Sequence, residues 1–232
     1  MPIMTDNPSV PRGEPIQQVV EVTFPVLGLS LPSNNGYPLL GAIARVMDGE
    51  YLRPGESLES IGGRGIEKGV IRVTQETRLR IRTFRPADIC VGLGCKVLEV
   101  SNHLIQLGIP EVREFAPASV LRSRIVTYAL KHKLEANATP SAELVLDSAR
   151  REMERAGIHG VVAARTIPKG PRKGEAMRRV VRVCDRNVVG YSLQVADLDP
   201  PSSILLQSIG LGGKRHHGCG IFFDPEARRA AR

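Results

Sequence analysis

The 232-residue chain has no tryptophan, and its aromatic content is only 4%. Base stacking on a ring-lined sheet is therefore not the expected binding mode. No apolar run approaches the ~18 residues that span a bilayer. Residues 1–15 lack the apolar core of a signal peptide, and their prolines and polar groups predict a disordered leader. The four cysteines form no CxxC pair and no histidine lies at a usual zinc spacing, so we expect reduced thiols, a cytoplasmic protein and no metal.

The charge balance is strongly basic. Lysine and arginine number 32 against 24 acidic residues, which gives a net charge of +8 and a pI of about 9.7. Such a balance is typical of proteins that bind nucleic acid or an anionic membrane surface. Since no segment predicts a membrane anchor, we expect the partner to be a nucleic acid and not a membrane.

The most informative segment is GLGGKRHHGCG, residues 210–220, between a predicted helix over 202–209 and a predicted strand over 218–223. Glycines permit positive φ and a close backbone approach to a ligand, and peptide N–H groups in such turns form anion-binding nests. The spacing is neither a Walker loop nor a Rossmann fingerprint, which weighs against an unrelated nucleotide enzyme. We predict a loop that grips a polyanion backbone with Gly210, Gly212, Gly213, Lys214, Arg215, His216 and His217.

Strand and helix patterns occur twice in the order β-α-β-β-α-β, which is typical of a ferredoxin-like unit. In the first half, strand patterns cover 17–24, 70–74, 78–84, 96–100 and 104–107, and helices begin near Pro38 and Ala87. In the second half, they cover 120–128, 161–167, 177–184 and 188–195, with a helix between an N-cap at Thr139 and a stop at Gly157. We predict an α+β fold of tandem ferredoxin-like (RRM-like) domains over 16–113 and 114–232, the second of which contains the glycine-rich loop.

Two further basic clusters are candidates for RNA contact. Arg78, Arg80 and Arg82 alternate along a predicted strand, so they point to one face about 6.6 Å apart, close to the spacing of phosphates along a nucleic-acid strand. A second stretch predicts a basic hairpin tip carrying Lys169, Arg172 and Lys173 that reaches into the groove of an RNA hairpin. The alternatives are a solvated sheet face and a solubilising loop.

GLGGKRHHGCGIF resembles the C-terminal loop of the CRISPR-associated repeat-RNA endoribonucleases, the sixth Cas protein family of the RAMP superfamily. The resemblance continues through FPVLGLSLPSNNGYPLLGAIARV, TRLRIR, VSNHLIQLGIPEV, PASVLRSRIVT, RRVVRV and NVVGYSLQVADL, in family order, and is strongest to the myxobacterial subtype. It implies an enzyme that binds the repeat hairpin of CRISPR precursor RNA and cuts it without metal or cofactor. In such enzymes the 2′-OH attacks the adjacent phosphate, and the protein stays on its product as a subunit alongside other Cas proteins.

One position departs from the family pattern. The resemblance places a catalytic histidine where this chain has Asn35, within Asn34-Asn35-Gly36-Tyr37. An amide cannot exchange a proton near neutral pH, so we expect Tyr37 and His216 to act as base or acid, with His103 and His217 as further candidates. The alternatives are a cleavage-deficient RNA-binding scaffold and a structural subunit that packs on other Cas proteins.

Overall fold

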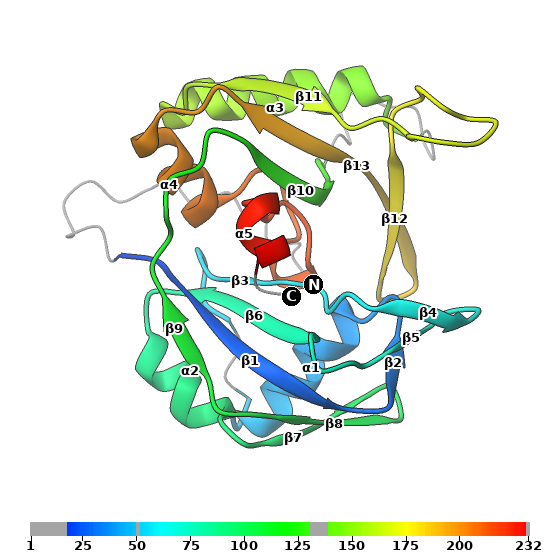
Figure 1. The fold of residues 1–232 in the computed structure, drawn as a ribbon, viewed down its shortest axis with the longest axis vertical. Helices are drawn as coiled ribbons and strands as arrows, with labels where there is room; N and C mark the ends of the chain where they lie inside the picture. Colours follow the sequence, from blue (N-terminus) through cyan, green and yellow to red (C-terminus); the bar gives the residue numbers. More distant parts are fainter. Residues whose placement is uncertain (1–17, 50–51, 130–138, 231–232) are drawn as a thin grey trace, which may run out of the picture.

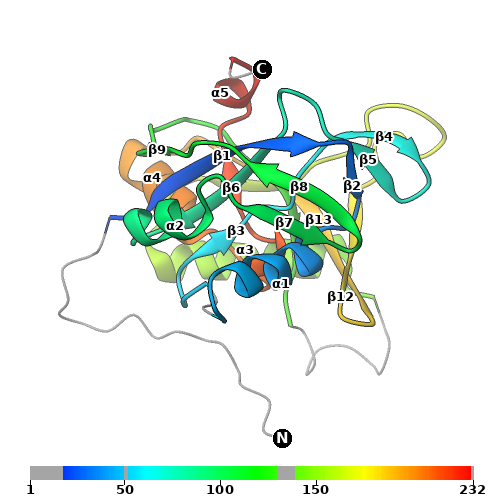
Figure 2. The same ribbon diagram turned by 90° about the horizontal axis from the view of Figure 1, so that it is seen from below.

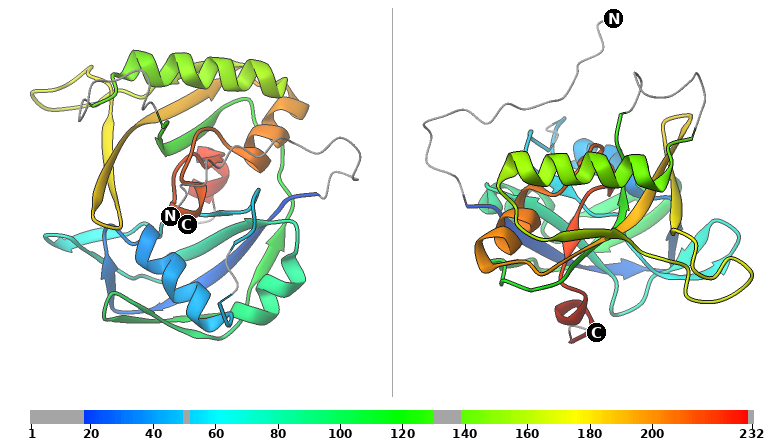
Figure 3. Two further views of the ribbon diagram at one scale, coloured as in Figure 1. Left: turned by 180° about the vertical axis from the view of Figure 1, so that it is seen from behind. Right: turned by 90° about the horizontal axis from the view of Figure 1, so that it is seen from above.

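The computed structural model describes residues 18–49, 52–129 and 139–230, so the expected disordered leader lies outside the described residues. Two antiparallel sheets lie one above the other in Figure 1. Helices α1, α2 and α3 lie behind the sheets (Figure 3). The short helix α5 (Pro225–Ala230) projects from the opposite side (Figure 2). No helix among the described residues is long and apolar enough to cross a membrane.

The first sheet has the strand order β3-β6-β1-β8-β7, with β9 also paired to β1. The strands are β1 (Val20–Gly28), β3 (Ser57–Leu58), β6 (Arg78–Thr83), β7 (Val97–Val100), β8 (His103–Leu107) and β9 (Glu111–Arg113). Alternate residues of β1, among them Val22, Phe24 and Val26, are buried against α1 (Gly36–Val46) and α2 (Pro86–Leu93) in one hydrophobic core. The period of two therefore turns the residues between them toward the face without helices.

The second sheet has the order β11-β13-β10-β14, with β12 also paired to β13. Its strands are β10 (Leu121–Val126), β11 (Val161–Ala164), β12 (Arg178–Val183), β13 (Arg186–Ala196) and β14 (Phe222–Phe223). Helix α3 (Ala142–Ala156) covers one face of this sheet and forms a second core with it. Its N-cap is Ser141, whose hydroxyl accepts from the Leu144 amide, so the prediction of Thr139 is wrong by two residues, while Gly157 ends the helix with φ 69° as predicted.

Some short elements depart from the predicted pattern. A small sheet of β2 (Ser30–Pro32), β5 (Val70–Arg72) and β4 (Arg64–Glu67) lies beside the first sheet, so the strand predicted over 70–74 is present as β5 but does not pair within the first sheet. The predicted strand over 218–223 is reduced to β14, because the glycines before it form a loop after helix α4 (Pro200–Ile209). The four cysteines are free, and Cys95 and Cys184 are exposed. We keep the division of the chain at residues 113 and 114 as a proposal.

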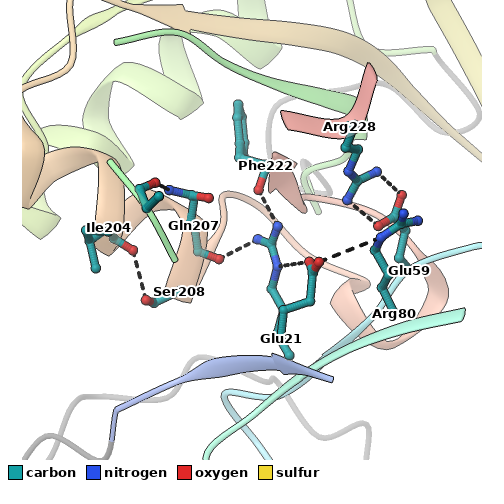
Figure 4. Close-up of polar contacts among 10 residues, drawn as sticks. Glu21, Glu59, Arg80, Ile204, Gln207, Ser208, Phe222 and Arg228 are labelled. Atoms are coloured by element: carbon teal, nitrogen blue, oxygen red, sulfur yellow. Dashed lines mark hydrogen bonds and ion pairs between the residues drawn. The ribbon is translucent and has the colours of Figure 1, made fainter. Parts of the chain in front are cut away.

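Buried charges join the two halves (Figure 4). Arg82 on β6 is 3% exposed and donates to the carbonyls of Gln207 on α4 and Phe222 on β14. Arg228 on α5 forms a two-pronged ion pair with Glu59 of the first half. Breaking a buried, hydrogen-bonded charge typically costs several kcal/mol, so these contacts set how the two sheets sit against each other.

Candidate nucleic-acid interface

The glycine-rich loop is packed into the protein rather than held open. The amides of residues 210–213 and 217–220 all donate to acceptors within the chain, among them Gly212 N to Glu152 Oε2 at 2.8 Å and Gly220 N to Ile125 O at 2.7 Å. A Cβ added to Gly210 would lie 2.2 Å from the Gly220 carbonyl oxygen. The glycines therefore allow two backbone segments to pass very close to each other. These eight amides do not form the predicted anion-binding nest.

The cations of the loop divide into two roles. Lys214 is exposed and adopts a left-handed conformation with φ 63°. Arg215 is half-buried and donates to the carbonyl of Ile209 at the end of α4, so it holds the loop. Lys214 is thus the loop cation that can reach a phosphate, and Arg215 is occupied by the fold.

The start of α1 contacts the single turn of 3-10 helix η1 (Arg215–His217). A Cβ on Gly36 would lie 2.4 Å from the His217 carbonyl oxygen, so only glycine fits there. The next residue, Tyr37, is 42% exposed and its ring centroid lies 5.6 Å from that of His217. Ser60 donates to the His217 carbonyl at 3.4 Å. The fold therefore brings the predicted Tyr37 beside the histidine pair from the far end of the sequence.

The two histidines have different surroundings. Nδ1 of His217 is buried and has no hydrogen-bond partner among the described residues. Burial, followed by the charges of Lys214 and His216, lowers the pKa of His217 to about 4. Nε2 of His216 lies 3.3 Å from the carbonyl oxygen of Arg53 at the surface. His217 is therefore neutral near pH 7, and both imidazoles lie where the two halves meet.

Asn35 is fully buried, and its amide is saturated by backbone groups. Nδ2 donates to Pro32 O at 2.9 Å and to Ile61 O at 2.8 Å, and Oδ1 accepts from Ile61 N at 2.8 Å. The side chain therefore fixes the turn that leads into α1 against residue 61. In this position Asn35 supports Tyr37 and does not itself face the surface.

The three alternating arginines do not form a free row. Arg78 donates to the carbonyls of Gln75 and Thr77, Arg80 lies 3.6 Å from a Glu21 carboxylate oxygen, and Arg82 is buried between the halves. Period-two alternation correctly puts Arg80 and Arg82 on one face, but that face is where the halves meet. We therefore reassign Arg82 from RNA contact to the interface.

The predicted basic tip lies between β11 and β12. Lys169, Arg172 and Lys173 are exposed, and the strand ends approach at the bridge between Thr166 and Ala176. Arg172 pairs with Glu175 at 2.7 Å. The loop projects from the body in Figure 1, so these cations stay candidates for contact with RNA.

The sequence does not reveal that His103 lies away from η1, or that Ser60 and Arg53 contact the histidine pair. His103 lies on β8 with Nδ1 3.0 Å from the Ser30 hydroxyl, in a different environment from η1. Ser60 and Arg53 contact the histidine pair but come from a stretch rich in glycine and proline that carries no motif. The described residues contain no group of three His, Cys, Asp or Glu side chains arranged to hold a metal ion.

Comparison with known proteins identifies this arrangement. The family model "Cas6 Crispr" matches residues 20–226, which include both sheets and the α1–η1 contact. The chain belongs to the Cas6 family. A CRISPR-associated endonuclease Cas6 from Myxococcus xanthus (strain DK1622) is 30% identical over 214 residues, which cover 92% of this chain and 84% of that protein. The predicted family and its myxobacterial likeness are thereby confirmed.

Solved structures share the Cas6 fold. The product of a Cas6-related gene from Pyrococcus furiosus aligns with a TM-score of 0.61 and 16% identity, over 88% of this chain and 98% of that one. A structure described as a RAMP protein binding different RNA substrates aligns with a TM-score of 0.62 and 14% identity, over 88% and 98%. Together with the two helix-backed antiparallel sheets, these likenesses confirm the predicted α+β class, and the predicted tandem ferredoxin-like units are consistent with them.

Proposed function

We propose that this Cas6-family chain binds the repeat hairpin of CRISPR precursor RNA and cleaves it. The observation that carries the proposal is the meeting of Tyr37 with His216 and His217 beside the exposed Lys214. An acid, a base and a phosphate-binding cation are the groups that cleavage by a neighbouring hydroxyl requires. The excess of basic residues supports RNA as the substrate.

In the proposed reaction one imidazole accepts the proton of the 2′-OH, whose oxygen attacks the adjacent phosphorus. The bond from phosphorus to the 5′-oxygen breaks, and a second group donates a proton to that oxygen. The products are a 2′,3′-cyclic phosphate and a 5′-OH. We assign Tyr37 and His216 to this proton transfer as predicted, and we add His217, which is neutral at pH 7 and lies against Tyr37. Lys214 neutralises the phosphate, and no metal takes part.

The test is incubation with the protein's own repeat RNA, with and without EDTA, resolved on a denaturing gel. We expect one cut that EDTA does not inhibit, a cyclic phosphate at the new 3′ end, and no cut when the attacking nucleotide is 2′-deoxy. Tyr37→Phe, His216→Gln and His217→Gln are expected to slow single-turnover cleavage. The matched control is His159→Gln, because His159 is an exposed imidazole after α3. Cleavage that requires a divalent ion would contradict the mechanism.

A second candidate function is a cleavage-deficient scaffold that binds the repeat RNA and other Cas subunits. The specific observation in its favour is Asn35, which stands where the family resemblance expects a histidine and whose amide is held by three backbone contacts. Tight binding of repeat RNA without any cut in the same assay would select the scaffold. Co-purification of the bound RNA with other Cas subunits would test the retained complex.

A further inference from the structure

The face of the second sheet that is turned away from α3 carries four arginines. Arg122 and Arg124 lie on β10, Arg179 lies on β12, and Arg165 follows the end of β11. Arg122 and Arg165 are half-buried, and the other two are exposed. Within the described parts of the chain, no carboxylate oxygen lies within 4.0 Å of any of the four guanidinium groups. We call these four residues the arginine cluster.

Strand register shows that the arginine cluster shares one face. Arg122 lies opposite Gln194 on β13, which lies opposite Ala163 on β11. Nε of Arg122 donates to the Gln194 side chain at 2.8 Å. Arg179 reaches the Ser192 hydroxyl at 3.5 Å, and Ser192 lies two residues from Gln194 on the same side of β13. Neighbouring strands are about 4.8 Å apart, so the guanidinium groups gather within a few strand widths.

Positive charge is in excess within the arginine cluster. Burial, and then the charges of Arg122 and Arg179, lowers the pKa of Arg165. Burial, and then the charge of Arg179, lowers the pKa of Arg124, and the charges of Glu59 and Cys219 offset only part of that shift. Like charges held this close repel one another, and an anion bound among them would relieve that repulsion.

A hollow of about 270 Å³ lies beside the arginine cluster. Its lining residues are Ala163, Ala164, Arg165, Thr166 and Gln194. Ala163, which lies opposite Gln194, leaves the sheet low at this point, while Arg165 and Gln194 supply polar groups beside it. A flat chain with a charged backbone can therefore approach the sheet here, whereas a bulky apolar anchor finds no apolar pocket.

We propose that the arginine cluster binds the phosphates of a single-stranded segment of RNA that flanks the hairpin, an inference that rests on the proposed function. Arginine forks match phosphate oxygens in paired hydrogen bonds. Arg122 and Arg124 are two residues apart, about 6.6 Å along an extended strand, close to the repeat of an unpaired polynucleotide. The open sheet face suits a single strand, and none of the four arginines is among the groups assigned to proton transfer, so the arginine cluster supplies affinity and register for the RNA.

The test compares Arg165→Gln/Arg179→Gln with the matched control Arg150→Gln/Arg178→Gln, which removes the same charge. Arg150 is on α3, and Arg178 lies opposite Tyr191, whose buried ring faces the α3 side, so the control arginines lie off the open face. Affinities are measured from 50 to 200 mM salt for the repeat RNA with its flanks and for the same hairpin without flanks. We expect the test variant to bind the flanked RNA at least ten-fold more weakly, with a salt slope smaller by about 0.7 for each lost phosphate contact.

The outcomes separate the inference from the proposed function. Three results would overturn the proposed role of the arginine cluster and leave the proposed RNA processing intact. They are an unchanged affinity in the test variant, an equal loss of affinity in the control, and an equal loss of affinity for the hairpin without flanks. If the wild type binds neither RNA, both proposals fail. Displacement of RNA by a poly-glutamate peptide at equal charge concentration would indicate an acidic protein partner and overturn the inference. Photo-crosslinking of 4-thiouridine in the flank to wild-type peptides 161–180 is expected, and its absence would count against the site whether or not the variant folds.

Discussion

Replacing Asn35 probes the turn on which the proposed site rests. In Asn35→Ala the Ile61 N–H and the carbonyls of Pro32 and Ile61 lose their partners inside a fully buried environment. An unsatisfied buried polar group costs about 1–3 kcal/mol, so three such groups predict a loss of about 3–9 kcal/mol of unfolding free energy. Asn34→Ala is the control, because the exposed Asn34 amide makes one long contact of 3.4 Å to Arg182 O. Its expected cost is within about 0.5 kcal/mol.

Urea unfolding followed by circular dichroism measures both changes, with equal m-values as the check that the same transition is compared. We also expect Asn35→His to lower stability and to leave single-turnover cleavage no faster than in the wild type. An imidazole cannot donate to both carbonyls and accept from the amide at once, and position 35 is closed to solvent. A loss below about 1 kcal/mol in Asn35→Ala would refute the hydrogen-bond argument. Faster cleavage in Asn35→His would show that the position reaches the RNA.

The remaining predictions concern the loop and the contact between the halves. The pKa of His217 is about 4 in the folded state and 6.5 in the unfolded state, so the unfolded state binds the proton first as pH falls. The free energy of unfolding should therefore fall by up to about 3 kcal/mol between pH 6.5 and pH 4. His217→Gln should make this pH dependence flatter, as measured by urea titrations at each pH. Lys214→Ala should weaken RNA binding without changing the melting temperature, whereas Arg215→Ala should lower the melting temperature, since its guanidinium caps α4. Arg82→Met should cost about 3–5 kcal/mol in the same denaturation assay, because two buried carbonyls lose a charged donor. Gly218→Ala should destabilise the protein in a thermal melt, since its Cβ would lie 1.9 Å from Ser60 Oγ; a melting temperature equal to that of the wild type would contradict this packing.

The strands and helices of the fold follow from local pattern, and the site does not. Alternation along β1 and β6 and the glycine stop of α3 are recorded in short stretches of sequence, and each is found within a few residues of its predicted place. The buried position of Arg82 depends on its contact with a carbonyl 140 residues further along the chain. Alternation alone does not distinguish a solvated sheet face from the face that meets the other half.

The glycine-rich loop is a second case in which the local sequence does not reveal the contacts that a segment makes. Its composition predicts positive φ, and Gly210, Gly212, Gly218 and Gly220 adopt it. Composition does not say whether the amides that such turns expose meet a ligand or another part of the chain. Here those of residues 210–213 and 217–220 meet the chain, and the tight approaches at Gly210 and Gly220 are to backbone oxygens.

The packing of the loop glycines determines which groups are left to bind RNA. Because these loop amides donate within the fold, phosphate binding depends on side-chain cations, namely those of Lys214, the hairpin tip and the arginine cluster. Side-chain cations release counterions on binding, so the proposed affinity must be strongly salt-dependent. The glycines of the loop then act on catalysis indirectly, because their close packing holds His217 against Tyr37 while Asn35 fixes the facing turn. Substitution of a loop glycine that preserves the Tyr37–His217 contact should therefore spare cleavage, and one that shifts η1 should reduce cleavage even at saturating RNA.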